Sequence, residues 1–294
     1  MSISGPILVF LANGVQGSAV VRAARRRGHA ARALMRARPD HATDRDAVIG
    51  DLDDPASLRA AAHGCAHAVL QIPAGPQPRM IAQAQAALDA LLAAGTRSLV
   101  LKLSSASRPA PCPDASFVAN AAIEALVRHA GIPFAVVRPT MYLDNLLKPS
   151  ARADIVDRAL VSPPIARDQR IAWTCVDDAA HVAILLLEQA RHGGDHLVCG
   201  PQAVTGDGLA KQLSIGLARP IAFRAEPVTL FEHDVAMAMG ADLAARIAAR
   251  FRYFAEHRDD ADRILGATPA PLRLPGFHPI SIAEWARRHR SLFR

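Results

Sequence analysis

A glycine turn follows the first apolar run of the chain. Ile7 to Leu11 is apolar throughout, and Gly14 and Gly17 follow it closely. In a dinucleotide-binding turn the first glycine permits a tight bend, the second lets the backbone approach the pyrophosphate, and the third lets the helix pack against the strand. Gly14 and Gly17 supply the second and third, whereas Leu11 occupies the place of the first. The pattern predicts a phosphate-binding turn, provided that Leu11 has a negative φ and packs inward.

Arg36 lies about 20 residues further on, directly after the expected second strand, Ala31 to Met35. Enzymes that select NAD usually present an acidic residue there to the ribose 2′-OH. A guanidinium can instead bind the 2′-phosphate of NADP through paired, charge-assisted hydrogen bonds, and Arg38 lies near enough in the chain to help. Arg36 therefore predicts NADP(H) as cofactor, with an ordinary surface arginine as the alternative.

Proton-transfer groups are sparse. The short-chain dehydrogenase relay needs a tyrosine followed at the fourth place by lysine, but Tyr142 is followed there by Leu146. Tyr142 could line a nicotinamide pocket or could be a core aromatic. Asn120 could donate a hydrogen bond to a substrate carbonyl or could be a helix-surface residue. The pair Asp177 and Asp178 is interpreted as capping the helix that follows it.

The remaining pattern indicates how these residues are positioned. Short apolar runs alternate with helical segments that end at glycine, which is typical of an α/β fold with a doubly wound parallel sheet. The expected strands are Ile7 to Leu11, Ala31 to Met35, Ala47 to Ile49, Ala68 to Ile72, Ser98 to Leu103 and Phe134 to Arg138. The expected helices between them are Val15 to Arg27, Pro55 to Ala62, Met80 to Ala94 and Ser116 to Ala130.

The regular alternation ends near Leu143. We expect residues 1–142 to form a Rossmann domain whose sheet is completed by 174–200. A smaller substrate-binding lobe would then contain 143–173 and 201–294. Strand candidate "DHLVCG" supplies the last sheet strand in this scheme.

Composition narrows the class of protein. The chain has 294 residues, 51% of them hydrophobic, and a formal net charge of +7. Its arginines lie in short helical clusters without interleaved aromatic residues, so we expect no nucleic-acid partner. The four cysteines lack metal-ligand or redox-pair spacing, and no metal is expected. With neither a leader pattern nor a membrane-spanning run, the sequence predicts a cytoplasmic protein.

Several segments together resemble the NmrA-like family of atypical short-chain dehydrogenases/reductases. They are "ANGVQGSAVVRAARRRGHAARALMR", "VIGDLDDPASLRAAAHGCAHAVLQIP", "GIPFAVVRPTMYLDNLL", "TCVDDAAHVAILLLE" and "ISIAEWARRHRSLF". The resemblance implies a Rossmann domain with a small C-terminal lobe. It also implies NADPH-dependent quinone, azo-dye, triphenylmethane, ether or isoflavone reduction, or redox-sensing regulation.

The resemblance also implies roles for particular positions. It places Ala12, Asn13, Gly14, Val15, Gln16 and Gly17 on the pyrophosphate, Arg36 on the 2′-phosphate, Asp51 and Leu52 by the adenine, Ile72, Pro73, Leu103 and Ser104 along the cofactor, and Pro139, Thr140, Met141 and Tyr142 by the nicotinamide. Many relatives carry a lysine four residues before a helical glutamate. Asn120 has that place here, before Glu124, so a proton-donating lysine is absent.

Three functions stay open from the sequence. The first is an NADPH-dependent reductase acting on a small conjugated carbonyl, quinone or similar acceptor. The second is an NADP(H)-binding redox sensor that signals through a protein partner, and the third is a nonredox isomerase on the same fold. A small-molecule substrate and a homodimer are expected in the first case.

Overall fold

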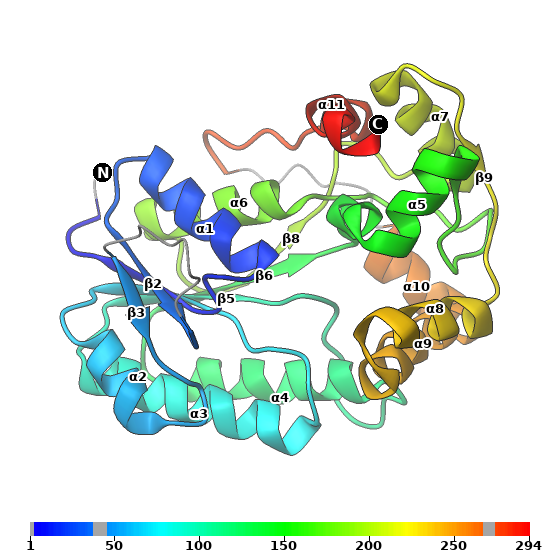
Figure 1. Ribbon diagram of the computed structural model, residues 1–294. Helices are drawn as coiled ribbons and strands as arrows, with labels where there is room; N and C mark the ends of the chain where they lie inside the picture. The colour runs from blue at the N-terminus through cyan, green and yellow to red at the C-terminus, as the bar shows by residue number, and fades with distance from the viewer. Residues whose placement is uncertain (1–2, 38–45, 267–273) are drawn as a thin grey trace. The chain divides into compact units, whose positions relative to one another are not determined.

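Seven short apolar segments form one parallel sheet within the described residues. The computed structural model describes residues 3–37, 46–266 and 274–294. Its strands are β1 Ile7–Val9, β2 Ala31–Met35, β3 Ala47–Ile49, β4 His67–Leu70, β5 Ser98–Lys102, β6 Phe134–Pro139 and β8 Asp195–Val198. Their spatial order is β3-β2-β1-β4-β5-β6-β8 (Figure 1). Every pairing is parallel, so all carboxyl ends meet at one edge of the sheet.

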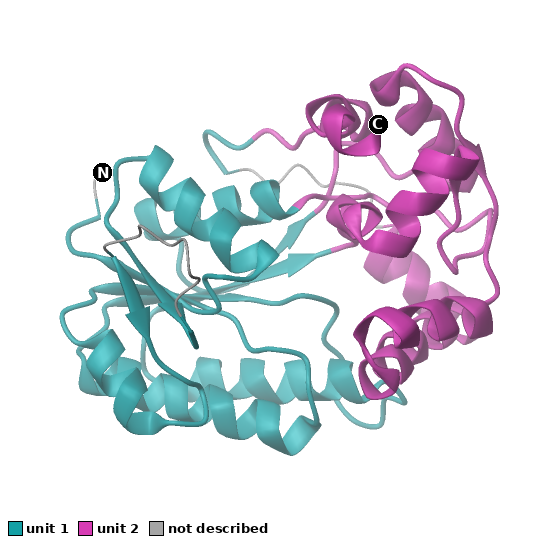
Figure 2. Cartoon of the chain, viewed as in Figure 1, with its two compact units in different colours: residues 1–139, 176–198, 273–277 teal, residues 140–175, 199–272, 278–294 magenta. Residues whose placement is uncertain are grey.

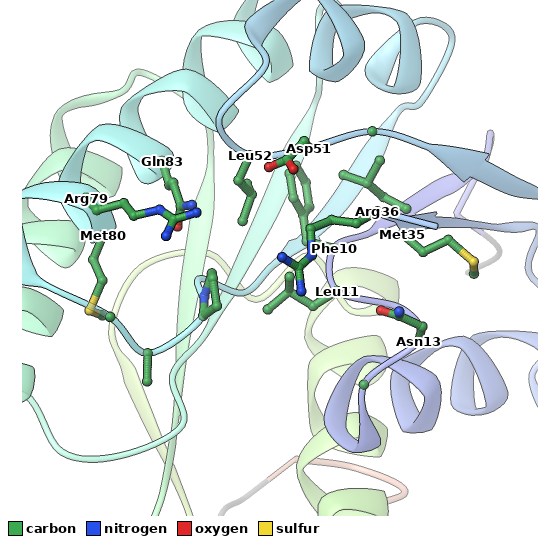
Figure 3. Close-up of a pocket in the computed structure, with 16 residues that line it drawn as sticks. Phe10, Leu11, Asn13, Met35, Arg36, Asp51, Leu52, Arg79, Met80 and Gln83 are labelled. Carbon is green, nitrogen blue, oxygen red and sulfur yellow. The ribbon is translucent and has the colours of Figure 1, made fainter. Parts of the chain in front are cut away.

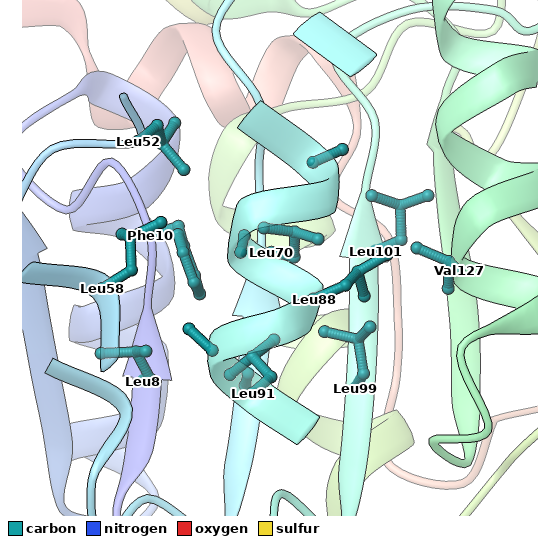
Figure 4. Packing of buried hydrophobic residues seen from close by; sticks show 14 of the residues in the cluster. Leu8, Phe10, Leu52, Leu58, Leu70, Leu88, Leu91, Leu99, Leu101 and Val127 are labelled. Atoms are coloured by element: carbon teal, nitrogen blue, oxygen red, sulfur yellow. The ribbon is translucent and has the colours of Figure 1, made fainter. Parts of the chain in front are cut away.

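Helices cover both faces of this sheet, as the alternating pattern predicts. One face carries α2 Pro55–Ala62, α3 Gln77–Ala93 and α4 Ala115–His129, and the other carries α1 Val15–Arg26 and α6 Val176–Glu188. Between the sheet and α2, α3 and α4 lies the hydrophobic core, where Phe10, Leu70, Leu88, Leu101 and Val127 are almost fully buried (Figure 4). The doubly wound α/β prediction is therefore confirmed.

Two helix starts test the capping interpretations. The Asp54 carboxylate accepts a hydrogen bond from the Ala56 amide at 3.0 Å and caps α2, as expected. The interpretation of Asp177 and Asp178 as residues preceding a helix is wrong. Helix α6 begins at Val176, so both aspartates lie in its first turn. There they still face the positive end of the helix dipole, and Asp177 also accepts from Arg22 of α1 at 2.9 Å.

The chain divides into two compact units (Figure 2). Unit 1 contains residues 1–139, 176–198 and 273–277, and unit 2 contains 140–175, 199–272 and 278–294. The seven-stranded sheet and its five helices belong to unit 1. Whether unit 1 binds NADP and unit 2 binds the substrate, with the boundaries given above, stays a prediction.

Unit 2 is mostly helical. It contains α5 Pro149–Arg158, α7 Gly206–Leu217, α8 Val228–Met239, α9 Ala241–Glu256, α10 Arg258–Leu265, α11 Ile282–Arg288, the 3-10 helices η1 Leu143–Leu147 and η2 Arg290–Phe293, and a two-stranded parallel sheet of β7 Leu160–Val161 and β9 Ala222–Phe223. Its largest fully buried side chain is Trp285 of α11. A Cβ on Gly216 of α7 would lie 2.4 Å from the Ala283 carbonyl, so α7 and α11 pack closely here.

No disulfide links the four cysteines, all of which lie in described segments. Over the described ranges no group of His, Cys, Asp or Glu side chains could hold a metal ion. Within those same ranges, none of the helices is both long enough and apolar enough to cross a membrane.

Candidate functional site

The turn between β1 and α1 closes with a left-handed leucine. Leu11 has φ +53°, so the expectation of a negative φ is wrong. Its carbonyl accepts from the Gly14 amide at 3.0 Å, which closes the turn over four residues. Its side chain is partly buried and packs against the core, as expected. Leu11 thus adopts a conformation that favours glycine, at a cost of about 1 to 2 kcal/mol, and packing helps to offset it.

Gly14 and Gly17 meet the Leu11 carbonyl from different positions. A Cβ on Gly17 would lie 2.1 Å from that oxygen, so only glycine lets α1 pack this closely against the turn. A Cβ on Gly14 would be 3.3 Å from the same atom, and Gly14 has an ordinary φ of −80°. Gly17 therefore allows α1 to pack closely against the turn. Gly14 leaves the exposed start of the helix without a side chain.

The N-terminus of α1 can receive an anion. No described side chain caps it, and no acidic residue lies in its first turn. Asn13, Gly14 and Val15 are exposed, whereas Ala12 is buried. Gln16 is half-buried, and its amide oxygen accepts a hydrogen bond from the buried ammonium of Lys102. Unsatisfied N–H groups and the helix dipole favour a phosphate at such an end.

A cavity of about 390 Å³ begins at this turn and extends along the carboxyl ends of β1, β2 and β3 (Figure 3). That volume falls in the range of small-molecule sites. The structure brings together on its wall six of the residues assigned to the cofactor, namely Asn13, Gly14, Arg36, Asp51, Leu52 and Pro73. Phe10 and Leu34 add apolar surface, so the lining of the cavity combines apolar side chains with a few charged groups.

Arg36 lies directly after β2 and its side chain extends into the region of the cavity (Figure 3). It is exposed, and among the described residues no hydrogen bond or ion pair engages its guanidinium. As far as the described residues are concerned, its N–H donors are therefore open to an anionic ligand. Arg38, the suggested helper, lies outside the described residues.

The other predicted cofactor residues lie elsewhere. Ile72 follows β4, while Leu103 and Ser104 follow β5, with Leu103 buried and Ser104 exposed. Pro139 ends β6. None of these lines the cavity described above. They lie at the carboxyl edge of the same sheet, where open α/β sheets bind ligands, and their roles stay predictions.

Thr140, Met141 and Tyr142 belong to unit 2. The Thr140 hydroxyl donates to the Ala172 carbonyl, and Tyr142 forms a β-bridge with Thr174. Burial holds the pKa of the Tyr142 phenol well above its usual range, and Asp144 raises it further. The 5% exposed Tyr142 is therefore a weak acid, which fits a core aromatic better than a proton donor.

Asn120 is buried rather than on the helix surface, with 5% of its area exposed. Its Nδ2 donates to Ser105 Oγ at 3.0 Å and to the Ala106 carbonyl at 2.7 Å. A carbonyl only accepts, so this contact fixes the orientation of the amide. Both N–H groups therefore hold the loop after β5. Donation to a substrate carbonyl stays a prediction, and it would require one of these bonds to break.

Sequence reasoning missed four residues around the site. Lys102 contacts Gln16, as described above. Arg79, Met80 and Gln83 of α3 line the cavity. Arg79 and Gln83 are four residues apart, hence on one face of the helix that follows β4, and this spacing is the sequence signal that could have identified them.

Comparisons with known proteins agree with this architecture. The chain is 30% identical over 273 residues to a (4-alkanoyl-5-oxo-2,5-dihydrofuran-3-yl)methyl phosphate reductase of Streptomyces griseus subsp. griseus, covering 88% of this chain and 90% of that protein. It is 27% identical to an NAD(P)H azoreductase of Xenophilus azovorans, covering 98% and 99% of the two chains.

Among solved structures, the Citrobacter sp. triphenylmethane reductase complexed with NADP(H) superposes with a TM-score of 0.74. The two sequences are 17% identical, and the match covers 97% of this chain and 99% of that one. At that identity the likeness concerns the fold. A model of the NmrA-like family matches residues 4–286, which is nearly the whole length. The chain belongs to the NmrA-like family.

Proposed function

We propose that this chain is an NAD(P)H-dependent oxidoreductase that uses NADP(H) to reduce a small conjugated carbonyl, quinone or similar acceptor. One observation carries the proposal. The Arg36 guanidinium, which no described residue engages, lies on the wall of the cavity that begins at the N-terminus of α1, where no described side chain forms a cap. Two separate anion-binding features on one cavity match a dinucleotide that carries a pyrophosphate and a further phosphate.

The residues present fit this cofactor. A Cβ on Gly17 would collide with the turn, as expected for a glycine that allows close helix packing. Leu11, in the place of the first glycine, adopts a left-handed conformation that closes the turn. In this proposal the α1 N-terminus holds the pyrophosphate, Arg36 holds the 2′-phosphate, and Asp51 and Leu52 border the adenine. Ile72, Pro73, Leu103, Ser104 and Pro139 border the remainder.

Bound NADPH supplies a hydride. This chain's own contribution is placement, because the buried Tyr142 is a weak acid with a raised pKa and both N–H groups of Asn120 are bonded within the chain. An acceptor with extended conjugation suits such a site, since the oxyanion formed on reduction is stable and can take its proton from water. The curated relatives agree with that class, as their names refer to a conjugated lactone and to azo compounds.

The same shortage of proton donors favours a second candidate, an NADP(H)-binding sensor without turnover. Assignment of acceptor binding to unit 2, a cytoplasmic location and a homodimer are further parts of the first proposal. None of the three is needed for the experiment that separates the candidates.

That experiment measures NADPH oxidation by the purified chain against quinones, enones, azo dyes and a phosphorylated butenolide, with NADPH binding measured by calorimetry. If the chain is a reductase, it oxidises NADPH with at least one acceptor class well above the rate of the same mixture without the protein. NADPH binding without turnover on any acceptor, combined with a cofactor-dependent change in self-association or partner binding, would establish the sensor instead.

A further inference from the structure

An arginine from α3 lies on the wall of the cavity where it borders the loop after β3. Arg79 Nη2 is 2.5 Å from Asp53 Oδ2, and Arg79 Nε is 3.5 Å from Asp53 Oδ1. Gln83, one turn along α3, donates to the same Oδ1 at 2.9 Å. Asp53 thus receives bonds from two side chains of one helix. This arrangement orients the plane of the Arg79 guanidinium, although the pair is exposed to solvent.

Arg79 and Arg36 both lie close enough to Asp53 to lower its pKa, but of the two it is Arg79 that forms a hydrogen bond to it. Asp53 pairs directly with Arg79, and Asp51 adds a second negative charge close enough to raise the pKa of Arg79 further. These two carboxylates partly offset the positive charge of Arg79, although Arg79 and Asp53 are exposed to solvent. A doubly charged phosphate would meet two carboxylates there, whereas a neutral aromatic base would not be repelled.

The surroundings of Arg79 are also those of a base site. Leu52 and the buried Met80 line the same cavity, and Figure 3 shows the side chains of Arg79 and Arg36 extending toward each other in the view. Hydrogen bonds to Asp53 occupy the Nε–Nη2 edge of the guanidinium, and 60% of the Arg79 side chain is exposed. Guanidinium faces stack on aromatic rings, and an oriented guanidinium loses little freedom in doing so.

We propose that Arg79, oriented by Asp53 and Gln83, stacks on the adenine ring of the dinucleotide, while Arg36 binds the 2′-phosphate. The proposal rests on the dinucleotide binding proposed above. It separates two arginines of one cavity by function, since one recognises a feature common to NADPH and NADH and the other recognises the feature that distinguishes them.

The test uses calorimetric titration of the wild-type protein, Arg79→Ala and Arg79→Lys with NADPH, NADH, 2′,5′-ADP and reduced nicotinamide mononucleotide. Arg79→Ala should weaken the binding of NADPH, NADH and 2′,5′-ADP by similar factors of about 2- to 30-fold, the range expected for a cation–π contact. Binding of the mononucleotide, which has no adenine, should not change. Arg79→Lys keeps the charge but not the planar face, so it should lose most of the same affinity.

Arg59→Ala, on the exposed side of α2, is the matched control and should change none of the affinities. Thermal melting of each variant verifies folding. Selective loss of NADPH and 2′,5′-ADP with NADH unchanged would make Arg79 a phosphate ligand and overturn the proposal, as would unchanged affinity for all ligands.

The outcome also separates this inference from the proposed function. Wild-type protein that binds no adenine nucleotide overturns both. Wild-type protein that binds NADPH, loses affinity as expected in Arg79→Ala and yet reduces no acceptor supports the stacking role while overturning the reductase.

Discussion

The carbonyl oxygen of Leu11 occupies the space that a side chain at Gly17 would need, since a Cβ there would lie 2.1 Å from it. The same oxygen accepts from the Gly14 amide. The Leu11 carbonyl therefore excludes a side chain at Gly17 and accepts the hydrogen bond from Gly14 that closes the turn.

Gly17→Ala and Gly14→Val should consequently have different effects. Gly17→Ala forces the backbone of the turn away from α1 and should lower the free energy of unfolding by about 1 to 3 kcal/mol, because overpacking at backbone cannot relax cheaply. Gly14→Val adds bulk at the exposed start of α1 and should abolish NADPH binding while the protein stays folded. Denaturant unfolding and NADPH titration of both variants distinguish the effects. A folded Gly14→Val protein with normal NADPH affinity would exclude the turn as the pyrophosphate site.

Because Leu11 has a φ of +53°, we expect glycine at this position to give a more stable protein than alanine, the reverse of the order usual within a helix. Leu11→Gly removes the left-handed strain along with the packing, whereas Leu11→Ala removes the packing and keeps the strain. Leu11→Gly should therefore be the more stable of the two by about 1 kcal/mol. Ala23→Gly in α1 is the control and should show the usual helical preference for alanine. Chemical denaturation measures all three, and an alanine variant at Leu11 as stable as the glycine variant would contradict the conformation.

Arg36→Ala should reduce NADPH affinity by about 1 to 3 kcal/mol, the scale of a lost charged hydrogen bond, with little change for NADH. The reason is that, among the described residues, no hydrogen bond or ion pair engages the Arg36 guanidinium. Calorimetric titration of both cofactors against both proteins measures the difference. Equal losses of affinity for NADPH and NADH would show that Arg36 does not bind the 2′-phosphate.

Asn120→Ala should affect the loop after β5 before it affects chemistry. Two buried hydrogen bonds to Ser105 and Ala106 are lost, so the free energy of unfolding should fall by about 1 to 3 kcal/mol. NADPH affinity should fall as well, since Ser104 adjoins this loop. Thermal melts, NADPH titration and kcat/KM are measured together. A drop of about tenfold in kcat/KM with stability and NADPH affinity unchanged would instead make Asn120 a direct donor to the acceptor.

Glu188 of α6 predicts a pH-dependent stability. Its carboxylate binds Arg27 Nη2 at 2.6 Å and His29 Nε2 at 2.6 Å. Burial acts to raise the pKa of Glu188, but hydrogen bonds from Arg27 and His29 outweigh it and the net pKa is lowered. A carboxyl with a lowered folded-state pKa stabilises the protein above its unfolded pKa, and this contribution is lost as pH falls through the folded pKa.

Glu188→Gln should accordingly lower the free energy of unfolding by about 1 to 3 kcal/mol at neutral pH, with the gap to wild type closing as the pH becomes acidic. Denaturant unfolding across that pH range measures the gap. A constant difference at every pH would show that the charge of Glu188 is not involved.

Much of unit 1 is predictable from the sequence because its signals are local. Short apolar runs define buried parallel strands, so the bounds of β2 and β3 agree with the expected segments, and Asp54 with Pro55 predicts the start of α2. Two strands end earlier than expected. β1 stops at Val9 because the chain turns at Leu11, and β4 stops at Leu70.

The sequence by itself determined the family, the doubly wound α/β fold, the glycine turn and the presence of Arg36 after β2, since each depends on residue type and spacing along the chain. Only the tertiary structure decided the left-handed φ of Leu11, the burial of Asn120 against its own loop, and the pairing of Arg79 with Asp53, which lie 26 residues apart. Those features depend on which elements meet across the sheet edge, and a residue's contacts there come from neighbours that sequence spacing does not identify.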